Sequence, residues 1–346
     1  MELVALCSIL PGPTSSQTIV AVGYRIGGPL LALLTMIVWA LPAVVVMISL
    51  SFLGHVLEIF HLSINVLRFI GPMAVGFIVL AALRVSRKVI VNQLTGALMV
   101  MSTFVTLFIR DSWVFPLVLL LGGMVTVFAS REKQLFTRIS LHPPWKYLII
   151  FLLLAFGLLA GSLFFDRTLI HIGESFYRYG YLVFGGGQVV VPVMYSDLVE
   201  VHAYMTDREF LTGYGLVQGL GGPMFSFAAY AGGLAARGST WPVQVIGAIL
   251  GGIGIFLPGL LLIYFVFPIW EQLKQLKAIR IALQGVGAVA GGMIAAAAII
   301  LLRTSGFSPI NLAVTALSIL LLAARRVPAP LIVLLTIAAG FIPMSA

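Results

Sequence analysis

The sequence predicts an all-α polytopic membrane protein, with about 12 transmembrane or half-spanning helices in two inverted repeats. Of its 346 residues, 61% are hydrophobic and only 9% are charged, whereas about a quarter are charged in a typical soluble domain. The runs Pro29–Leu53 and Trp241–Pro268 contain no charged residue, and each exceeds the roughly 20 apolar residues that span a bilayer. In addition, a series of Gly and Pro motifs recurs in the same order in the second half of the chain.

Charge, cysteine and histidine content exclude several classes of protein. The net charge of +9 comes from basic residues in short loops, so it does not indicate a nucleic-acid partner. The single cysteine, Cys7, excludes a disulfide framework and a thiolate metal site, and we expect it to be a small buried residue. His55 and His61 are six residues apart and do not share a helix face, so no metal site is expected. The sequence has no Walker motif and no nucleophile elbow, which argues against an ATP-driven pump, an enzyme or a cofactor.

Apolar runs between charged or Pro/Gly breaks locate the helices. Nine runs are clear spans: 29–53, 66–83, 91–109, 113–129, 147–165, 243–268, 281–302, 308–324 and 329–344. Three further stretches, 1–22, 180–199 and 211–236, are apolar but rich in Gly, Pro and small polar residues. If all three of them cross the membrane, the chain has about twelve spans.

The distribution of Lys and Arg predicts the orientation. If the basic loop at 84–88 is cytoplasmic, alternation through all the spans places fourteen basic residues inside and five outside. In this topology Arg208 lies inside and Arg237 outside, because the stretch 211–236 crosses between them. Omitting one weak span would move two strongly basic loops to the outside. The bias therefore favours either that all three weak stretches cross or that an even number do not.

The opening residues have an echo in the second half of the chain. Met1–Pro13 (MELVALCSILPGP) aligns with Leu211–Pro223 (LTGYGLVQGLGGP), 210 residues later. The further matching pairs are Gly23 with Gly233 at that offset and, at an offset of 216, Pro42 with Pro258, Gly71 with Gly287, Gly76 with Gly292, and Arg87 with Arg303. Because the predicted orientation places Arg87 inside and Arg303 outside, the two copies are inverted, as is common in secondary transporters.

This repeat divides the chain into three parts. Residues 1–130 form the first transporter repeat, 131–165 a cytoplasmic loop and a linker span, and 166–346 the second repeat with inverted topology. The second repeat contains the stretch 180–199 before its GGP motif, and the first repeat has no counterpart to that stretch. We therefore expect the first repeat to be N-terminally incomplete, through a truncated or misannotated start or a shortened natural variant.

One candidate binding element is the string YLVFGGGQVVVPVM, which contains Gly185, Gly186, Gly187, Gln188 and Pro192. Each glycine costs a helix about 1 kcal/mol relative to alanine. Free backbone at membrane depth is tolerated only where protein buries it or a wet cavity lines it. The string predicts a helix break beside a polar cavity; the alternative is close helix packing through small residues.

The second candidate element is PGPTSSQ, near the start of the sequence. Its residues are Pro11, Gly12, Pro13, Thr14, Ser15, Ser16 and Gln17. Proline is favoured in the first turn of a helix, so we expect a half-helix to start near Pro13 or Thr14 within the membrane. Its free N–H groups and positive dipole end would then face an anion. The second copy supplies Gly222, Pro223 and Ser226. We expect the PGP element and its GGP counterpart to converge near the midplane. The alternative for the PGP element is a capped helix that lies on the membrane surface.

Three arginines are candidates for attracting an anion or for gating. Arg25 and Arg237 follow the two Pro motifs, although both suit equally well as interface anchors. Arg68 lies within a predicted span beside Gly71 and Pro72, and a bundle-facing arginine is functional by default. No carboxylate pair or histidine pair is evident at the midplane.

The combination of LPGPTSSQ, FGGGQVVVP, the QGLGGP echo and the duplicated halves resembles the chromate ion transporter (CHR) family, over nearly the whole chain. The resemblance implies two oppositely oriented halves with about thirteen spans, in the bacterial inner membrane. It implies export of chromate, for which sulfate is the structural look-alike, driven by ion gradients. The site residues that it implies are Pro11, Gly12, Pro13, Ser16, Gln17, Gly185, Gly186, Gly187, Pro192, Gly222 and Pro223. The sequence departs from the family in lacking an FGG-type motif before LPGP.

The expected function is therefore secondary active export of chromate by alternating access, giving chromate resistance. The expected partners are chromate or a sulfate-like oxyanion, the lipid bilayer and a coupling ion, either a proton or an exchanged anion. Two alternatives stay open: a transporter of another inorganic anion such as sulfate, and a membrane scaffold or lipid-headgroup enzyme. Nothing in the sequence supports a homo-oligomer.

Overall fold

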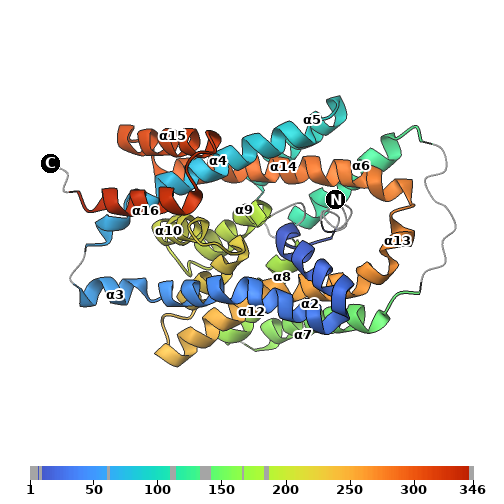
Figure 1. Cartoon of the computed structure of the whole chain (residues 1–346), viewed down its shortest axis with the longest axis horizontal. Coiled ribbons are helices and arrows are strands. Elements are labelled where there is room, and N and C mark those ends of the chain that lie inside the picture. The colour runs from blue at the N-terminus through green and yellow to red at the C-terminus, as the bar shows by residue number, and fades with distance from the viewer. Residues whose placement is uncertain are drawn as a thin grey trace.

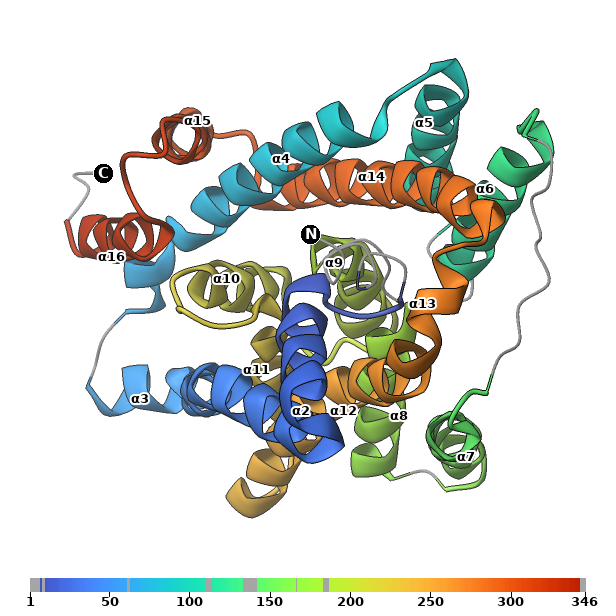
Figure 2. The same cartoon turned by 45° about the vertical axis from the view of Figure 1, so that its right-hand side comes forward.

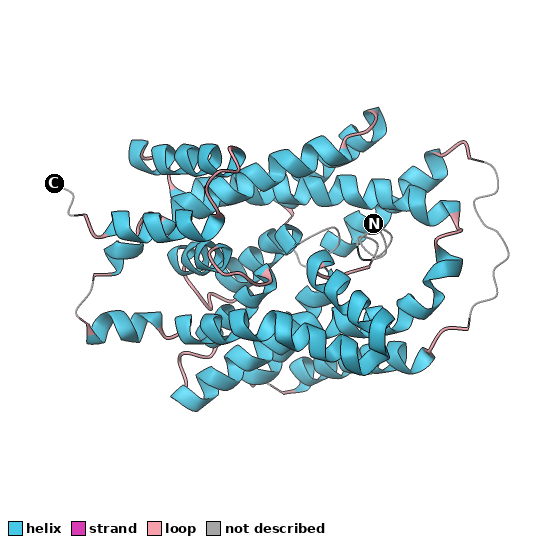
Figure 3. Cartoon of the chain, in the orientation of Figure 1, coloured by secondary structure: helices cyan, strands magenta, loops and turns pink. Residues whose placement is uncertain are grey.

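The computed structural model describes residues 7, 10–60, 63–109, 114–132, 142–165, 167–182 and 187–342. All regular secondary structure in these residues is helical (Figure 3), as the sequence predicted. The first-half elements are α2 (Thr14–Leu50), α3 (Leu53–Ile59), η1 (Ile64–Leu67), α4 (Ile70–Val89), α5 (Gln93–Phe108) and α6 (Val114–Ala129), followed by α7 (Trp145–Phe164). The later elements are α8 (Thr168–Leu182), η2 (Gly187–Val189), α9 (Val190–Tyr195), η3 (Ser196–Val201), α10 (Asp207–Gln218), η4 (Met224–Ser226), α11 (Phe227–Ala235), α12 (Trp241–Val266), η5 (Phe267–Ile269), α13 (Trp270–Leu273), α14 (Lys277–Ser305), α15 (Pro309–Ala323) and α16 (Ala329–Gly340).

The long helices are membrane-spanning by length and composition. Five are long and apolar enough to cross: Thr14–Leu50, Asn65–Val89, Trp145–Phe164, Trp241–Ile269 and Lys277–Ser305. Five of the nine clear predicted spans overlap these long helices, and the other four overlap the shorter apolar helices α5, α6, α15 and α16. The predicted linker span, α7, has no buried residue, so it contacts lipid over most of its surface. The chain is a multi-pass membrane protein.

Two layers of long helices enclose a set of shorter ones (Figures 1 and 2). Helices α4, α5, α14 and α15 lie on one side, and α2, α7 and α12 lie on the other. The short helices α9 and α10 lie between the layers. The elements that contain the predicted binding motifs are thus surrounded by protein, which is the setting in which broken helices are tolerated at membrane depth.

Helix α2 is two helices joined by a sharp kink. Gly27 and Gly28 have non-helical backbone angles, and Gly28 has a φ of +70°, a conformation that glycine adopts without strain. The segment before the kink begins at Thr14, where the sequence predicted a helix start. Just after the kink, the Pro29 carbonyl accepts a hydrogen bond from the Tyr264 hydroxyl at 2.5 Å, which fixes the bend against α12.

The weak stretch 180–199 does not cross the membrane. Helix α8 ends at Leu182, and the chain then reverses, because Asp197 returns to bond Arg178 and Tyr179 of α8. The described segments 168–182 and 187–201 therefore form the two arms of a hairpin, and Gly187, the last residue of the FGGG motif, begins the second arm.

The stretch 211–236 is a second hairpin, which corrects the predicted topology. Arg237 forms an ion pair with Glu209, so both ends of this stretch lie at the same end of the molecule and Arg208 and Arg237 are not on opposite sides. The physical reason is the Gly-Gly-Pro break, which ends α10 at Gln218 and turns the chain before η4 and α11. Two non-crossing stretches are an even number, which is the option that the charge bias left open.

Helices α4 and α14 make matching contacts with the opposite half. A Cβ on Gly76 would lie 2.8 Å from the Cβ of Ser318, and a Cβ on Gly292 would lie 2.9 Å from the Cβ of Ser102. Gly76 and Gly292 are 216 residues apart, and so are Ser102 and Ser318. The same backbone approach thus occurs twice, with the halves exchanged, as an inverted repeat requires.

Candidate anion-binding site

The PGP motif forms a tight turn at the start of α2. Gly12 has a φ of +129°, a region that disfavours every other residue. The Gln17 side-chain amide folds back and donates to the Pro11 carbonyl at 2.7 Å. Pro13 is the N-cap and no side chain caps the helix, so the first N–H groups of α2 lack a side-chain partner.

Buried polar atoms without partners gather at this helix start. The Thr14 hydroxyl and the Gln17 side-chain oxygen are buried and form no hydrogen bond. Ser16 is buried and accepts a hydrogen bond from the Trp39 indole at 3.4 Å, whereas Ser15 is exposed. Buried polar atoms are nearly always paired, so two orphans in one turn indicate a place for a polar ligand or water.

The GGP motif forms the corresponding turn of the second hairpin. Pro223 is the N-cap of η4, again without a side-chain cap. Ser226 is fully buried, and its hydroxyl has no partner. The turn packs closely on α2, where a Cβ on Gly222 would lie 2.5 Å from the Cβ of Ala43.

Each turn packs on a long helix of the other half: the PGP turn packs on α12, and the GGP turn packs on α2. A Cβ on Gly12 would lie 3.4 Å from the Cα of Gly259, and Gly259 directly follows Pro258 near the middle of α12. The partner of Gly222, Ala43, directly follows Pro42 of α2. Both helix starts therefore lie well inside the length of a membrane-spanning helix.

Gly187, the last residue of the FGGG motif, packs against the residues that directly follow the GGP turn. A Cβ on Gly187 would lie 2.8 Å from Met224 and 3.1 Å from Phe225. Gln188 is half-buried and Pro192 is buried in α9, while Gly185 and Gly186 lie outside the described residues. The structure thus brings together two of the motifs that the sequence predicted to share a site.

The three candidate arginines do not lie at these turns. Arg25 is exposed, two residues before the kink in α2. Arg68 lies at the end of η1, where it donates to the Ile342 carbonyl at 2.7 Å. Arg237 pairs with Glu209. The turns therefore offer helix ends and neutral polar groups.

Sequence reasoning missed Gln218, the last residue of α10. Its side-chain nitrogen is buried without a partner, so the second hairpin presents the Gln218 amide and the Ser226 hydroxyl as unfilled donors. The signal was present, because Gln218 stands in the QGLGGP string, but nothing local distinguishes a buried unpaired amide from an exposed one.

Sequence reasoning also missed a buried charged network on the first hairpin. Arg178 bonds Glu174 at 2.8 Å and Asp197 at 3.0 Å. The Tyr179 hydroxyl donates to Asp197 at 2.5 Å, and His202 lies 3.2 Å from the same carboxylate. Sequence reasoning found no carboxylate pair at the midplane, whereas the structure brings Glu174 and Asp197 together on Arg178. The network's only sequence signal is the i, i+4 spacing of Glu174 and Arg178; the reversal of the chain supplies the rest.

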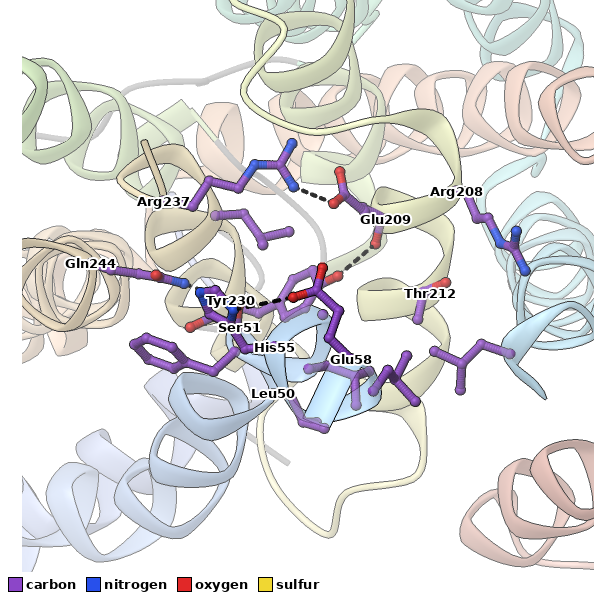
Figure 4. Close-up of a pocket in the computed structure, with 16 residues that line it drawn as sticks. Leu50, Ser51, His55, Glu58, Arg208, Glu209, Thr212, Tyr230, Arg237 and Gln244 are labelled. Carbon is purple, nitrogen blue, oxygen red and sulfur yellow. Dashed lines mark hydrogen bonds and ion pairs between the residues drawn. The ribbon is translucent and has the colours of Figure 1, made fainter. Parts of the chain in front are cut away.

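A cavity of about 280 Å³ lies at the other end of the second hairpin (Figure 4). The Arg237–Glu209 ion pair borders it, and the Tyr230 hydroxyl donates to the Glu209 carbonyl at 3.1 Å. The Gln244 amide donates to the Ser51 carbonyl at 3.1 Å, which joins α12 to the end of α2. The ends of α2, α10 and α11 therefore surround this cavity.

The turns have the properties of an oxyanion site. Helix N-termini bind anions through free N–H groups and the helix dipole, and the Thr14, Gln218 and Ser226 side chains add neutral donors. Among the described residues, no group of three His, Cys, Asp or Glu side chains is placed to hold a metal ion.

Comparison with known proteins decides the family. The family model described as "Chromate transporter" matches the chain in two segments, residues 1–127 and 170–342. The chain belongs to the chromate transporter family. The Chromate transport protein of Pseudomonas aeruginosa is 25% identical over 86% of this chain and 70% of its own length. The Chromate transport protein of Cupriavidus metallidurans is 26% identical over 88% and 73% of the two chains.

The similarity extends to cyanobacteria. The Probable chromate transport protein of Synechococcus elongatus is 24% identical over 99% of this chain and 84% of its own length. No solved structure matches the chain. Membership of this family makes transport, and not catalysis, the activity to explain.

Proposed function

We propose that this protein is a secondary active transporter that exports chromate across the bacterial inner membrane by alternating access, and so gives chromate resistance. Family membership supports chromate as the transported ion. The observation that carries the proposal is the pair of uncapped, proline-led helix starts at the PGP and GGP turns, with unpartnered hydroxyls on Thr14 and Ser226.

The neutral hydrogen-bond donors at the turns suit the transport of chromate. Chromate is a tetrahedral dianion, and removing it from water requires several donors. Fully charged ligands would bind it tightly and slow its release, whereas conduction and transport need binding that can be reversed. N–H groups, hydroxyls and one amide supply donors without a fixed charge.

The second hairpin offers an access route. Its tip is the GGP turn, and its open end borders the cavity of Figure 4, where Arg237 pairs with Glu209. By the charge bias this end faces away from the cytoplasm. We assign the ion pair to closure of that end, and movement of one repeat against the other to its opening.

Two experiments test the proposal. Expression in a chromate-sensitive host should give survival and lower chromate accumulation. The variants Thr14→Val, Ser226→Ala, Gln17→Ala and Gln188→Ala should reduce efflux at unchanged protein level. Ser15→Ala, which removes an exposed hydroxyl from the same turn, is the matched control and should retain efflux.

The outcomes separate the alternatives. No protection together with unchanged chromate uptake contradicts chromate export. In that case, sulfate flux that depends on Thr14 and Ser226 would support the second candidate, a transporter of another tetrahedral oxyanion at the same turns.

A further inference from the structure

The charged network on the first hairpin pairs two carboxylates with one guanidinium. The Glu174 and Asp197 side chains are 11% and 6% exposed, and Arg178, which lies between them, is 21% exposed. Two buried carboxylates thus share one guanidinium. A buried uncompensated charge is costly, so the network favours one additional proton.

His202 is the group that can accept this proton from water. Its Nδ1 lies 3.0 Å from the Asp197 backbone oxygen and 3.2 Å from the carboxylate oxygen Oδ1. Both are acceptors, so Nδ1 carries the hydrogen and Nε2 is free to take a proton. The side chain is 38% exposed and lies in the loop after η3. The hydrogen bond that His202 donates to the Asp197 carboxylate raises the pKa of His202 above its usual 6.5.

Few other titratable groups face the network. The Tyr179 hydroxyl donates to Asp197, and the Tyr204 ring stacks on His202 with centroids 5.1 Å apart. Along the chain, His171 precedes Glu174 by one turn and Glu200 follows Asp197 by one turn, and Tyr181 lies near Glu174. The packed helices α7, α11 and α12 contain one charged residue, Lys146, in the first turn of α7. Helix α14 packs on α9 and carries Lys277, Arg280 and Arg303. Tyr195 of α9 hydrogen-bonds Thr304 of α14 and donates to Asp207 of α10.

The network and the PGP turn contact α12 five residues apart, at Gly254 and Gly259, which is about 7.5 Å along the helix axis. Phe176 and Tyr177, between Glu174 and Arg178, pack on Gly254 near the middle of α12. Four residues after Arg178, α8 ends at Leu182. Asp197 and Arg178 join α8 to the arm that begins at Gly187, and Gly187 packs on Met224 and Phe225 directly after the GGP turn. Charge on the network therefore acts on an anion at the turns through a low-dielectric interior, where electrostatic interactions are strong.

We propose that this network binds a proton at His202 when the dianion binds at the turns. With His202 neutral, the network has one excess negative charge, which repels a dianion; protonation removes it. The linkage is reciprocal, so the anion also raises the affinity for the proton. This inference rests on the proposed function and deepens it: mutual stabilisation favours anion exchange with an accompanying proton over antiport of a proton against the anion.

Chromate binding to the purified full-length protein tests the proposal. Radiolabelled chromate is titrated between about pH 6 and pH 9, a range that spans histidine titration. His202→Gln keeps an N–H for Asp197 but cannot be protonated, and Glu174→Gln leaves one carboxylate for one guanidinium. Chromate itself takes up a proton in this range, but free chromate is common to all variants, so affinity ratios cancel that effect.

We expect the wild-type affinity, divided by that of His202→Gln, to fall with rising pH by up to about tenfold per unit, as one linked proton requires. The affinity of Glu174→Gln, divided by that of His202→Gln, should stay high up to the alkaline end of this pH range. His142→Gln, at an exposed histidine before α7, should follow the wild type.

Two results have different meanings. A constant ratio between wild type and both network variants, with chromate bound by all of them, overturns the proton linkage and leaves the proposed function intact. Absence of chromate binding at every pH contradicts the proposed function itself. If His202→Gln does not fold, the ratio of wild type to Glu174→Gln carries the test and should also fall with rising pH.

Discussion

The two halves of the molecule share their anion-binding geometry but differ in charge. Each half has a proline-led, uncapped helix start with an unpartnered hydroxyl, on Thr14 in the first half and on Ser226 in the second. Each start packs on the long helix of the other half, through Gly12 and Gly222. The reciprocal contacts support the prediction of two inverted copies.

The charged network has no counterpart in the described part of the first half. Glu174, Arg178 and Asp197 belong to the hairpin before the GGP turn, and no other buried carboxylate occurs among the described residues. Under the proposed function, the donors for the anion come from both halves, whereas the titratable groups come from one. The turns that both halves share form the proposed binding site, and the network of the second half alone forms the proposed proton site.

The largest expected effect is loss of transport when either turn is filled. Gly12→Val forces a side chain onto a backbone with φ +129°, and Gly222→Val overlaps Ala43. Both variants should abolish chromate efflux, measured in cells with protein level checked by blotting. Gly221→Ala, whose added Cβ meets nothing within 4 Å, is the control. Activity retained by one of the two valine variants would show that the turns are not equivalent.

The next effect is a loss of affinity without loss of stability. Thr14→Val and Ser226→Ala remove hydroxyls that bond nothing in the protein. A hydrogen bond to a charged group contributes about 1.5–3 kcal/mol, so each variant should bind chromate at least tenfold more weakly. The melting temperature should stay equal or rise, because a buried unsatisfied group is removed. A parallel fall in melting temperature would instead indicate a structural role.

A smaller effect is expected at the two matching glycines. Gly76→Ala and Gly292→Ala each place a methyl group against a serine and a backbone oxygen of the opposite half, and such overpacking costs about 1–3 kcal/mol. Thermal unfolding in detergent should show destabilisation for both. It should be larger for Gly292→Ala, whose added Cβ would lie closer to the Met99 carbonyl oxygen than the 2.8 Å that separates the added Cβ of Gly76→Ala from the Thr315 carbonyl oxygen. An unchanged melting temperature in either variant would weaken the case for inverted copies.

The smallest effect is expected at the exposed pair of Lys277 and Glu132. Their side chains are 2.8 Å apart and each is 55% exposed, and exposed ion pairs contribute little. Lys277→Gln should therefore leave both efflux and melting temperature unchanged within error, and a clear loss of either would show that this contact between the halves matters.

Local signals determined what the sequence could predict. Apolar length located the nine clear spans, and Pro13 located the start of α2, because hydropathy and proline chemistry act within a few residues. The reversals between α8 and α9 and at 219–223 were missed because an apolar hairpin and an apolar crossing have the same composition. The Arg178–Asp197 contact depends on one of those reversals, so it could not be predicted from the sequence.

A structure determined with bound chromate would test the proposed site most directly. The anomalous signal of chromium should lie at the turns, within hydrogen-bonding distance of the Thr14, Gln218 or Ser226 side chains. Chromium found only at the Arg237–Glu209 cavity, with the turns empty at saturating chromate, would contradict binding at the helix starts.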